Sequence, residues 1–73
     1  MKRLNRQGAI IISAGSLAGY NTIPKLAKAA GIPYTTLLRD LTVDFGSMTT
    51  DRLRAIVRIT RMKPNQILEI VKD

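Results

Sequence analysis

Residues 23–41 read IPKLAKAAGIPYTTLLRDL, and this stretch decides the fold that the sequence predicts. Thr22, just before it, can cap a helix, because its hydroxyl can accept a hydrogen bond from a free backbone N–H. Gly31 can adopt the left-handed conformation that ends a helix and turns the chain sharply. Pro33 presets the backbone for the first turn of another helix, which we expect to end near Leu41. The stretch therefore predicts two short helices joined by a tight turn.

The spacing of small and apolar residues in this stretch is typical of a helix-turn-helix. Ala27 is small enough to let the two helices approach closely, and Gly31 makes the turn four residues later. Ile32 can tuck under the turn, and Leu37 can face the first helix. Although A-x-x-x-G alone occurs in many helix pairs, the longer pattern L-A-x-x-x-G-I-x-x-x-x-L favours a helix-turn-helix.

The charge of the chain favours a polyanionic partner. Twelve Lys and Arg residues against five Asp and Glu residues give a net charge of +7. Such an excess indicates nucleic acid first and a membrane surface second. No apolar run approaches the roughly 18–20 residues that a membrane span requires, so we expect no transmembrane segment. Of the two polyanionic partners we expect nucleic acid and no membrane. Few aromatic residues are present to stack bases, which disfavours a nonspecific coat on single strands.

The composition also argues against an enzyme. The chain has no Cys and no His, which excludes disulfides, Cys-based zinc sites and catalysis by histidine. It has no paired carboxylates and no phosphate-binding glycine loop. We therefore expect no enzymatic activity, no metal, no cofactor and no small-molecule ligand.

The N-terminal segment is basic and then apolar, as in a signal peptide, but its apolar run is short. Ala9–Ile12 is four residues long, whereas signal peptides have about 7–15. We therefore expect residues 1–73 to form a single domain that acts in the cytoplasm of a bacterial or phage-infected cell.

Three further helices are predicted by apolar residues at helical spacing. They span Lys2–Ala18, Thr50–Arg61 (capped by Thr49 or Thr50) and Pro64–Lys72. The first is weakened by its glycines, and its AIII segment could instead be a strand. Thr42–Met48 is predicted to be a loop that Phe45 anchors on the core. Residues expected to face the core are Leu4, Gly8, Ile11, Ile12, Gly15, Ala18, Ile23, Leu26, Ala27, Ala30, Leu37, Leu41, Leu53, Ile56, Val57 and Thr60.

The segments LAKAAGIPYTTLLRDL and MTTDRLRAIVRITRMKPNQIL together resemble the lambda-repressor/Cro type of helix-turn-helix domain, also called the Xre family. The resemblance covers about residues 22–70. It implies an all-α fold, a compact five-helix bundle whose second and third helices form the helix-turn-helix. It also implies a dimeric transcription regulator that places its third helix in the major groove of double-stranded DNA. Because no ligand or cleavage domain is present, the chain is most similar to a stand-alone Cro-like protein or a short phage-type repressor.

The resemblance places the base-reading positions on the third helix. Arg39 can bind guanine O6 and N7, which is worth about 1–3 kcal/mol of discrimination. Thr35, Thr36 and Leu38 can meet a thymine methyl group, and Tyr34 can meet a base or a phosphate. The predicted base contacts are Tyr34, Thr35, Thr36, Leu38 and Arg39, and the predicted backbone contacts are Asn21, Thr22, Lys25, Thr42, Lys2 and Arg3.

Three positions depart from the family pattern. Many members have Gln where this chain has Ile23, so the usual contact there shifts to Asn21 or Thr22. Asp40 stands where many members have a hydrophobe, with Leu41 taking the core role. Pro33 replaces the Ser or Thr that usually caps the third helix.

The last predicted helix has more apolar surface than one chain needs to bury. Four apolar residues fall within five positions, which leaves some for a partner chain. The predicted homodimer interface consists of Ile67, Leu68, Ile70 and Val71.

Several alternatives stay open at this stage. Arg39 could instead pair with Asp40 or Asp44, and Tyr34 could be a packed surface aromatic. The basic side chains of Lys2, Arg3 and Arg6, and those of Arg54, Arg58 and Arg61, could contact phosphates or simply be solvated. The whole chain could also be a protein-interaction module of the same fold, docking through its last helix and the Phe45 loop.

Overall fold

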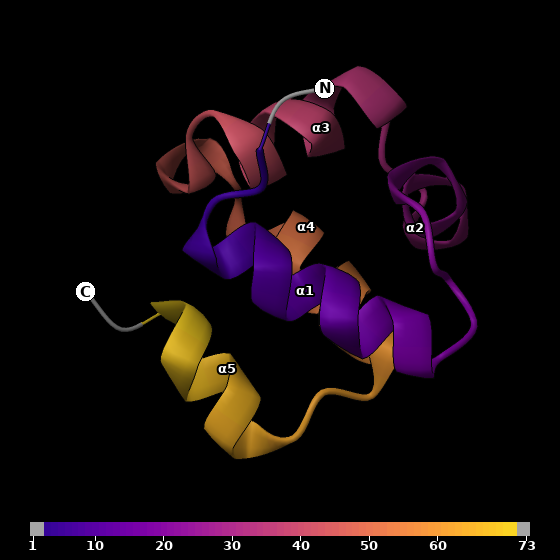
Figure 1. The fold of residues 1–73 in the computed structure, drawn as a ribbon, viewed down its shortest axis with the longest axis vertical. Helices are drawn as coiled ribbons and strands as arrows, with labels where there is room; N and C mark the ends of the chain where they lie inside the picture. Colours follow the sequence, from indigo (N-terminus) through magenta and orange to yellow (C-terminus); the bar gives the residue numbers. More distant parts are fainter. Residues whose placement is uncertain (1–2, 72–73) are drawn as a thin grey trace.

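The computed structural model describes residues 3–71, which form five α-helices and one short 3-10 helix, with no strand among them. The helices pack around one core, with α1 running across the middle and α3 along one side of it (Figure 1). This confirms the predicted all-α, five-helix architecture. Within residues 3–71, no helix is both long and apolar enough to cross a membrane. The elements are α1 (Arg6–Leu17), α2 (Ile23–Ala30), α3 (Tyr34–Thr42), η1 (Phe45–Ser47), α4 (Thr50–Thr60) and α5 (Pro64–Val71).

The ends of α2 and the start of α3 follow local signals. The Thr22 hydroxyl accepts a hydrogen bond from the Lys25 N–H, which confirms it as the cap of α2. Gly31 is left-handed, with φ 72°, and ends α2 as predicted. Pro33 precedes α3 without a side-chain cap. At α4 the cap is Thr49, whose hydroxyl accepts from the Arg52 N–H.

The start of α1 differs from the prediction. The helix begins at Arg6, and Lys2 lies outside the described residues. Asn5 is the cap, and its side-chain oxygen accepts from the Gly8 N–H at 2.6 Å. The Asn5 backbone N–H donates to the Leu41 carbonyl at 2.8 Å, so it is used by α3 rather than by a longer α1. The AIII segment is helical, which excludes the strand alternative.

Every α-helix contributes at least one fully buried side chain to the core. These are Ile11 from α1, Leu26 from α2, Leu37 and Leu41 from α3, Ile56 from α4 and Ile70 from α5. The predicted core positions are thus confirmed at the centre of α1, α2, α3 and α4, whereas Ile70 of α5 had been predicted to lie in a dimer interface. The prediction that Ala18 faces the core is wrong, because α1 ends at Leu17 and Ala18 is exposed.

A close approach between α1 and α3 explains the glycine at position 8. Gly8 is buried in α1, and a methyl group added there would overlap the carbonyl oxygen of Leu41. Gly8 costs helix propensity, but no larger residue fits this crossing. The glycine therefore lets α1 support the C-terminal end of α3.

Candidate nucleic-acid interface

The two faces of α3 have different surroundings. Leu37, Asp40 and Leu41 are buried on its inner face. On its outer face Thr35 and Arg39 are exposed, and Tyr34 is 45% exposed. The other predicted contact residues of this helix, Thr36, Leu38 and Thr42, are half-buried. The predicted base-reading residues therefore lie toward the surface, while the positions between them hold the helix on the core.

Arg39 is free to bind a ligand. Among residues 3–71, its guanidinium makes no hydrogen bond or ion pair. Asp40 pairs with Arg52 instead, and the Asp44 carboxylate accepts from the Gly46 N–H at 2.9 Å. The alternative in which Arg39 pairs with one of these carboxylates is therefore wrong.

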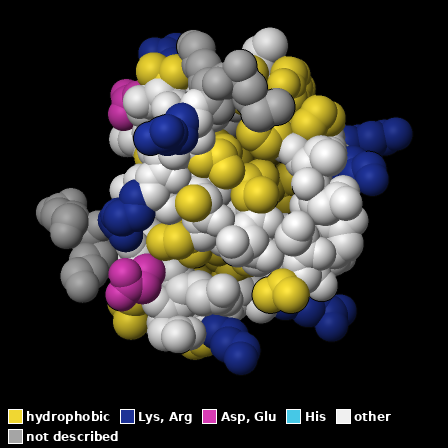
Figure 2. Space-filling view, in the orientation of Figure 1, with side chains coloured by type: hydrophobic (Ala, Val, Ile, Leu, Met, Phe, Trp, Pro, Cys, Tyr) yellow, Lys and Arg dark blue, Asp and Glu magenta, His cyan; other side chains and the backbone are white. Residues whose placement is uncertain are grey.

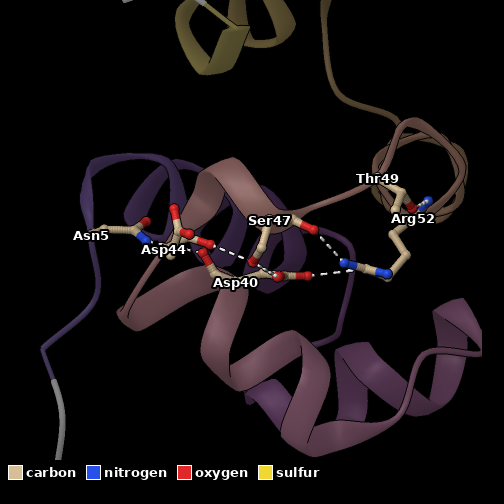
Figure 3. A network of polar contacts seen from close by, with 6 residues as sticks. All are labelled: Asn5, Asp40, Asp44, Ser47, Thr49 and Arg52. Atoms are coloured by element: carbon tan, nitrogen blue, oxygen red, sulfur yellow. Dashed lines mark hydrogen bonds and ion pairs between the residues drawn. The ribbon is translucent and has the colours of Figure 1, made fainter.

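Asp40 is the polar centre of the contacts that hold α3 (Figure 3). It is only 1% exposed, and Arg52 Nε lies 3.1 Å from its Oδ2. The Ser47 hydroxyl lies 2.9 Å from its Oδ1. Both carboxylate oxygens therefore have a donor, which offsets the cost of burying the charge. Leu41 is fully buried next to it, as expected for the residue that replaces the family's hydrophobe.

The same contacts connect three elements. The Arg52 guanidinium also donates to the Ser47 carbonyl at 2.7 Å. Asn5 adds α1, because its side-chain amide donates to the Asp40 carbonyl at 3.0 Å. The inner face of α3 is thus tied to η1, to the first turn of α4 and to the cap of α1 (Figure 3). The sequence analysis did not predict a role for Arg52. The one signal for it was the carboxylate of Asp40 on the same helix face as Leu37 and Leu41, because a buried carboxylate requires a cationic partner.

Three of the predicted backbone-contact residues meet at the N-terminus of α2. The Lys25 ammonium donates to the Asn21 side-chain oxygen at 3.3 Å, and Thr22 caps the helix. All three residues are exposed. The free N–H groups and the dipole of a helix N-terminus favour an anion. Ile23, at the family's Gln position, packs against the core instead.

The other predicted backbone contacts are more scattered. Thr42 donates its hydroxyl hydrogen to the Leu38 carbonyl at 2.6 Å, so the hydroxyl is already engaged within α3. Arg3 is exposed and precedes α1. Arg6 joins α1 to α5, because its guanidinium donates to the Glu69 carbonyl at 2.6 Å. The structure thus gives Arg6 a structural contact, and its phosphate contact stays a prediction.

Fewer residues of α5 are exposed than the four that were predicted to form the dimer interface. Ile70 is 1% exposed and belongs to the core, so it has no surface to offer a partner. Leu68 and Val71 are 65% and 56% exposed, and Ile67 is half-buried. In Figure 2, apolar side chains gather in the middle of the view, over α1 and on the side of it that faces α3 in Figure 1, and most Lys and Arg side chains stand toward the edge.

Two other predicted features are resolved by the structure. Phe45 is half-buried against the core, which confirms it as the anchor of the loop. The basic side chains of Arg54, Arg58 and Arg61 are exposed, as predicted. However, α4 ends at Thr60 rather than at Arg61. Arg61 is left-handed, with φ 54°, and is the only non-glycine residue of the described chain with a positive φ.

Comparison with protein families identifies this arrangement. Residues 17–73 match the model of the Cro/C1-type HTH DNA-binding domain. The match begins at the last residue of α1 and includes α2, α3, α4 and α5. Searches of curated proteins and of solved structures found no match.

Proposed function

The chain belongs to the Cro/C1-type family of helix-turn-helix DNA-binding domains, and we propose that it is a sequence-specific transcriptional regulator that reads the major groove with α3. The observation that carries this proposal is the Arg39 guanidinium, which makes no hydrogen bond or ion pair within residues 3–71 and lies on the outer face of a helix whose inner face is buried. A side chain of this kind reaches base edges without first breaking a contact of its own.

Base recognition in this proposal comes from the outer face of α3. Arg39 donates two hydrogen bonds to guanine O6 and N7, which sets the strongest preference. Thr35 and Tyr34 lie nearer the N-terminus of the helix, and the family places its readers there. Thr36 and Leu38 are half-buried and contribute apolar contact with a thymine methyl group.

Phosphate contacts then fix the register of the protein on the duplex. Asn21, Thr22 and Lys25 hold one phosphate at the N-terminus of α2. Arg3, Lys2 and Thr42 supply the remaining phosphate contacts. With about six phosphates neutralised, the slope of log affinity against log salt is about −5.

One chain offers one recognition helix, so useful affinity requires two copies. We propose a homodimer formed through Leu68 and Val71, with Ile67 at its edge. Two such helices read half-sites separated by one turn of DNA, about 34–36 Å. Residues 1–73 then act as one DNA-binding domain, in the manner of a Cro-like protein or a short phage-type repressor.

Selection of bound sequences from a random duplex pool tests this function. We expect an enriched palindromic consensus with a guanine in each half-site. Equal affinity for selected and random duplexes at one salt concentration would overturn the proposal.

A second candidate function is a protein-interaction module. It is favoured by a groove beside Val71, between α5, η1 and the start of α4, that Phe45, Met48 and Leu53 line. This function requires the apolar face but not Arg39. Loss of regulation in Leu68→Asp, with full regulation kept in Arg39→Ala, would favour it over DNA reading.

A further inference from the structure

A hollow of about 700 Å³ lies where the C-terminal ends of α1 and α4 meet the start of α5. These three ends lie close together in Figure 1. The residues that line the hollow belong to them or to the turns that follow α1 and α4, and none comes from α2 or α3. Binding pockets in proteins have volumes of about 300–1,000 Å³. The hollow is therefore large enough for a ligand, and it is separate from the helix-turn-helix.

Part of the lining is apolar. Leu17, the last residue of α1, is 88% exposed, more than any other large apolar residue among residues 3–71. A lone exposed leucine is common on protein surfaces. This one, however, borders a concave site together with Ile59, which is half-buried on α4, and Ala14, which is buried one turn earlier on α1. The hollow can therefore bury a large apolar side chain of a partner.

Two cations line the same hollow. Arg61 and Lys63 are exposed, and among residues 3–71 neither side chain makes a hydrogen bond or an ion pair. The Lys63 backbone N–H does have a partner, since it donates to Gln66 Oε1 at 3.0 Å, but the ammonium group does not take part. None of the residues that line the hollow is Asp or Glu. The hollow thus presents two positive charges beside an apolar surface.

The backbone of Arg61 indicates that its side chain has a use of its own. Arg61 has φ 54°, in the left-handed region where glycine is favoured at the end of a helix. A cation near a helix C-terminus is favourable, but Arg58 already supplies one in the last turn of α4. Residues that keep an unfavourable backbone conformation are concentrated at functional sites. We therefore count the Arg61 guanidinium as part of the binding surface.

An acidic peptide segment that also carries a large apolar side chain fits these features. We propose that the hollow docks such a segment of another protein. The apolar side chain packs on Leu17 and Ile59, and carboxylates of the segment pair with Arg61 and Lys63. This inference goes beyond the proposed function, because it needs neither α3 nor a duplex.

Charge disfavours two other occupants. A second copy of this chain brings a net charge of +7 and only five acidic residues, of which Asp40 is buried. The backbone of DNA carries the required negative charge but offers no large apolar group to cover Leu17. A segment of a different, acidic protein satisfies both the cations and the apolar wall.

Selection from a random library of short displayed peptides tests this inference. The full chain is the target, and peptides that also bind the Leu17→Ala protein are first removed. We expect the enriched peptides to carry a net negative charge and at least one large apolar residue. Enrichment of basic or uncharged peptides, or of no peptide, would overturn the proposal. One enriched peptide, labelled with a fluorescent dye, is then titrated against the unmodified protein and its variants.

Arg61→Gly separates peptide binding from stability. The substitution removes a cation of the hollow at a backbone position that favours glycine, so the thermal midpoint should not fall. We expect the labelled peptide to bind about tenfold more weakly to Arg61→Gly and to Leu17→Ala. Arg58→Ala is the matched control, because Arg58 is an equally charged, exposed residue that does not line the hollow, and it should weaken binding by less than about twofold. Equal weakening by Arg58→Ala and Arg61→Gly would show that only the net charge matters and would overturn the proposal.

Two further outcomes would assign the hollow to another occupant and overturn the proposal. Loss of concentration-dependent self-association in Leu17→Ala, measured by sedimentation, would show that a second copy occupies it. If Leu17→Ala and Arg61→Gly weaken binding to a random duplex as much as Lys25→Ala does, the hollow is part of the DNA interface. None of these measurements depends on an enriched DNA sequence, so failure of the proposed function and failure of this inference are distinguishable.

Discussion

Arg52 Nε lies 3.1 Å from Asp40 Oδ2, and this ion pair joins the inner face of α3 to the first turn of α4. Asp40 is almost fully buried, whereas the Arg52 side chain is 26% exposed. The pair is therefore reached by water from one side only. It holds the helix that carries Arg39, so the stability of the fold depends on a residue next to the proposed base reader.

Removal of Arg52 should destabilise the fold more than removal of any exposed arginine. Loss of one partner from a buried pair costs about 3–5 kcal/mol, and we expect about 2–3 kcal/mol for Arg52→Ala because water reaches that side chain. The measurement is the free energy of unfolding in urea. Arg54→Ala, on the exposed side of the same helix, is the matched control and should change it by less than about 0.5 kcal/mol. Equal effects of the two substitutions would contradict the role given to the ion pair.

The crossing of α1 and α3 should not tolerate a methyl group. Gly8→Ala improves helix propensity by about 1 kcal/mol but forces α1 away from the Leu41 carbonyl. We expect a net loss of about 1–3 kcal/mol in the free energy of unfolding. Ser13→Ala, at an exposed position of the same helix, should be neutral or slightly stabilising. A stabilised Gly8→Ala protein would show that the two helices are further apart than described.

A glycine at position 61, the C-cap of α4, should stabilise the fold. Arg61 is left-handed, with φ 54°, a conformation that costs an L-residue about 1–2 kcal/mol and costs glycine little. We expect Arg61→Gly to raise the free energy of unfolding by about 0.5–1 kcal/mol. Arg58→Gly, inside the helix, removes the same charge and should lower it by about 1 kcal/mol. A loss in both variants would contradict the left-handed cap.

The local signals of the sequence were enough to predict the helix-turn-helix. Thr22 and Gly31 act on their own helix, so their roles follow from neighbours a few residues away. The true start of α1 could not be predicted in this way, because the backbone partner of Asn5 is Leu41, on another helix. The burial of Asp40 could not be predicted either, because its ionic partner Arg52 lies on another helix, beyond the loop that follows α3. Long-range pairs of this kind are decided by packing and leave no periodic pattern in the chain.

The surface residues were predictable only in part. The helical period of α3 separates Leu37 and Leu41 from Thr35 and Arg39, so the two faces were predicted correctly. On α5, four apolar residues in five positions do not indicate which of them faces inward. Ile70 is the buried one, and Leu68 and Val71 are left outside. The exposure of Val43 could also be seen only once α3 had been placed on the core.

The apolar residues left on α5 should support cooperative binding to two half-sites. We expect Leu68→Asp to weaken binding to a duplex with two half-sites while leaving the affinity for a single half-site unchanged. A carboxylate in a dimer interface is desolvated without a partner, which disfavours the dimer. Leu17→Asp is the control, because Leu17 is 88% exposed on α1, outside the proposed interface. Identical behaviour of the two variants on both duplexes would exclude this dimer.

Arg39 gives the most direct test of sequence-specific reading by α3. The measurement is the affinity of the unmodified protein, Arg39→Ala and Lys25→Ala for the selected duplex and for a random duplex at one salt concentration. Loss of about 1–3 kcal/mol of base discrimination corresponds to about 5- to 150-fold weaker binding of the selected duplex by Arg39→Ala, with a much smaller change on the random duplex. Lys25→Ala should weaken both duplexes by similar factors, as expected for a phosphate contact. If Arg39→Ala also weakens both duplexes equally, α3 does not read bases through this side chain, and the central claim is wrong.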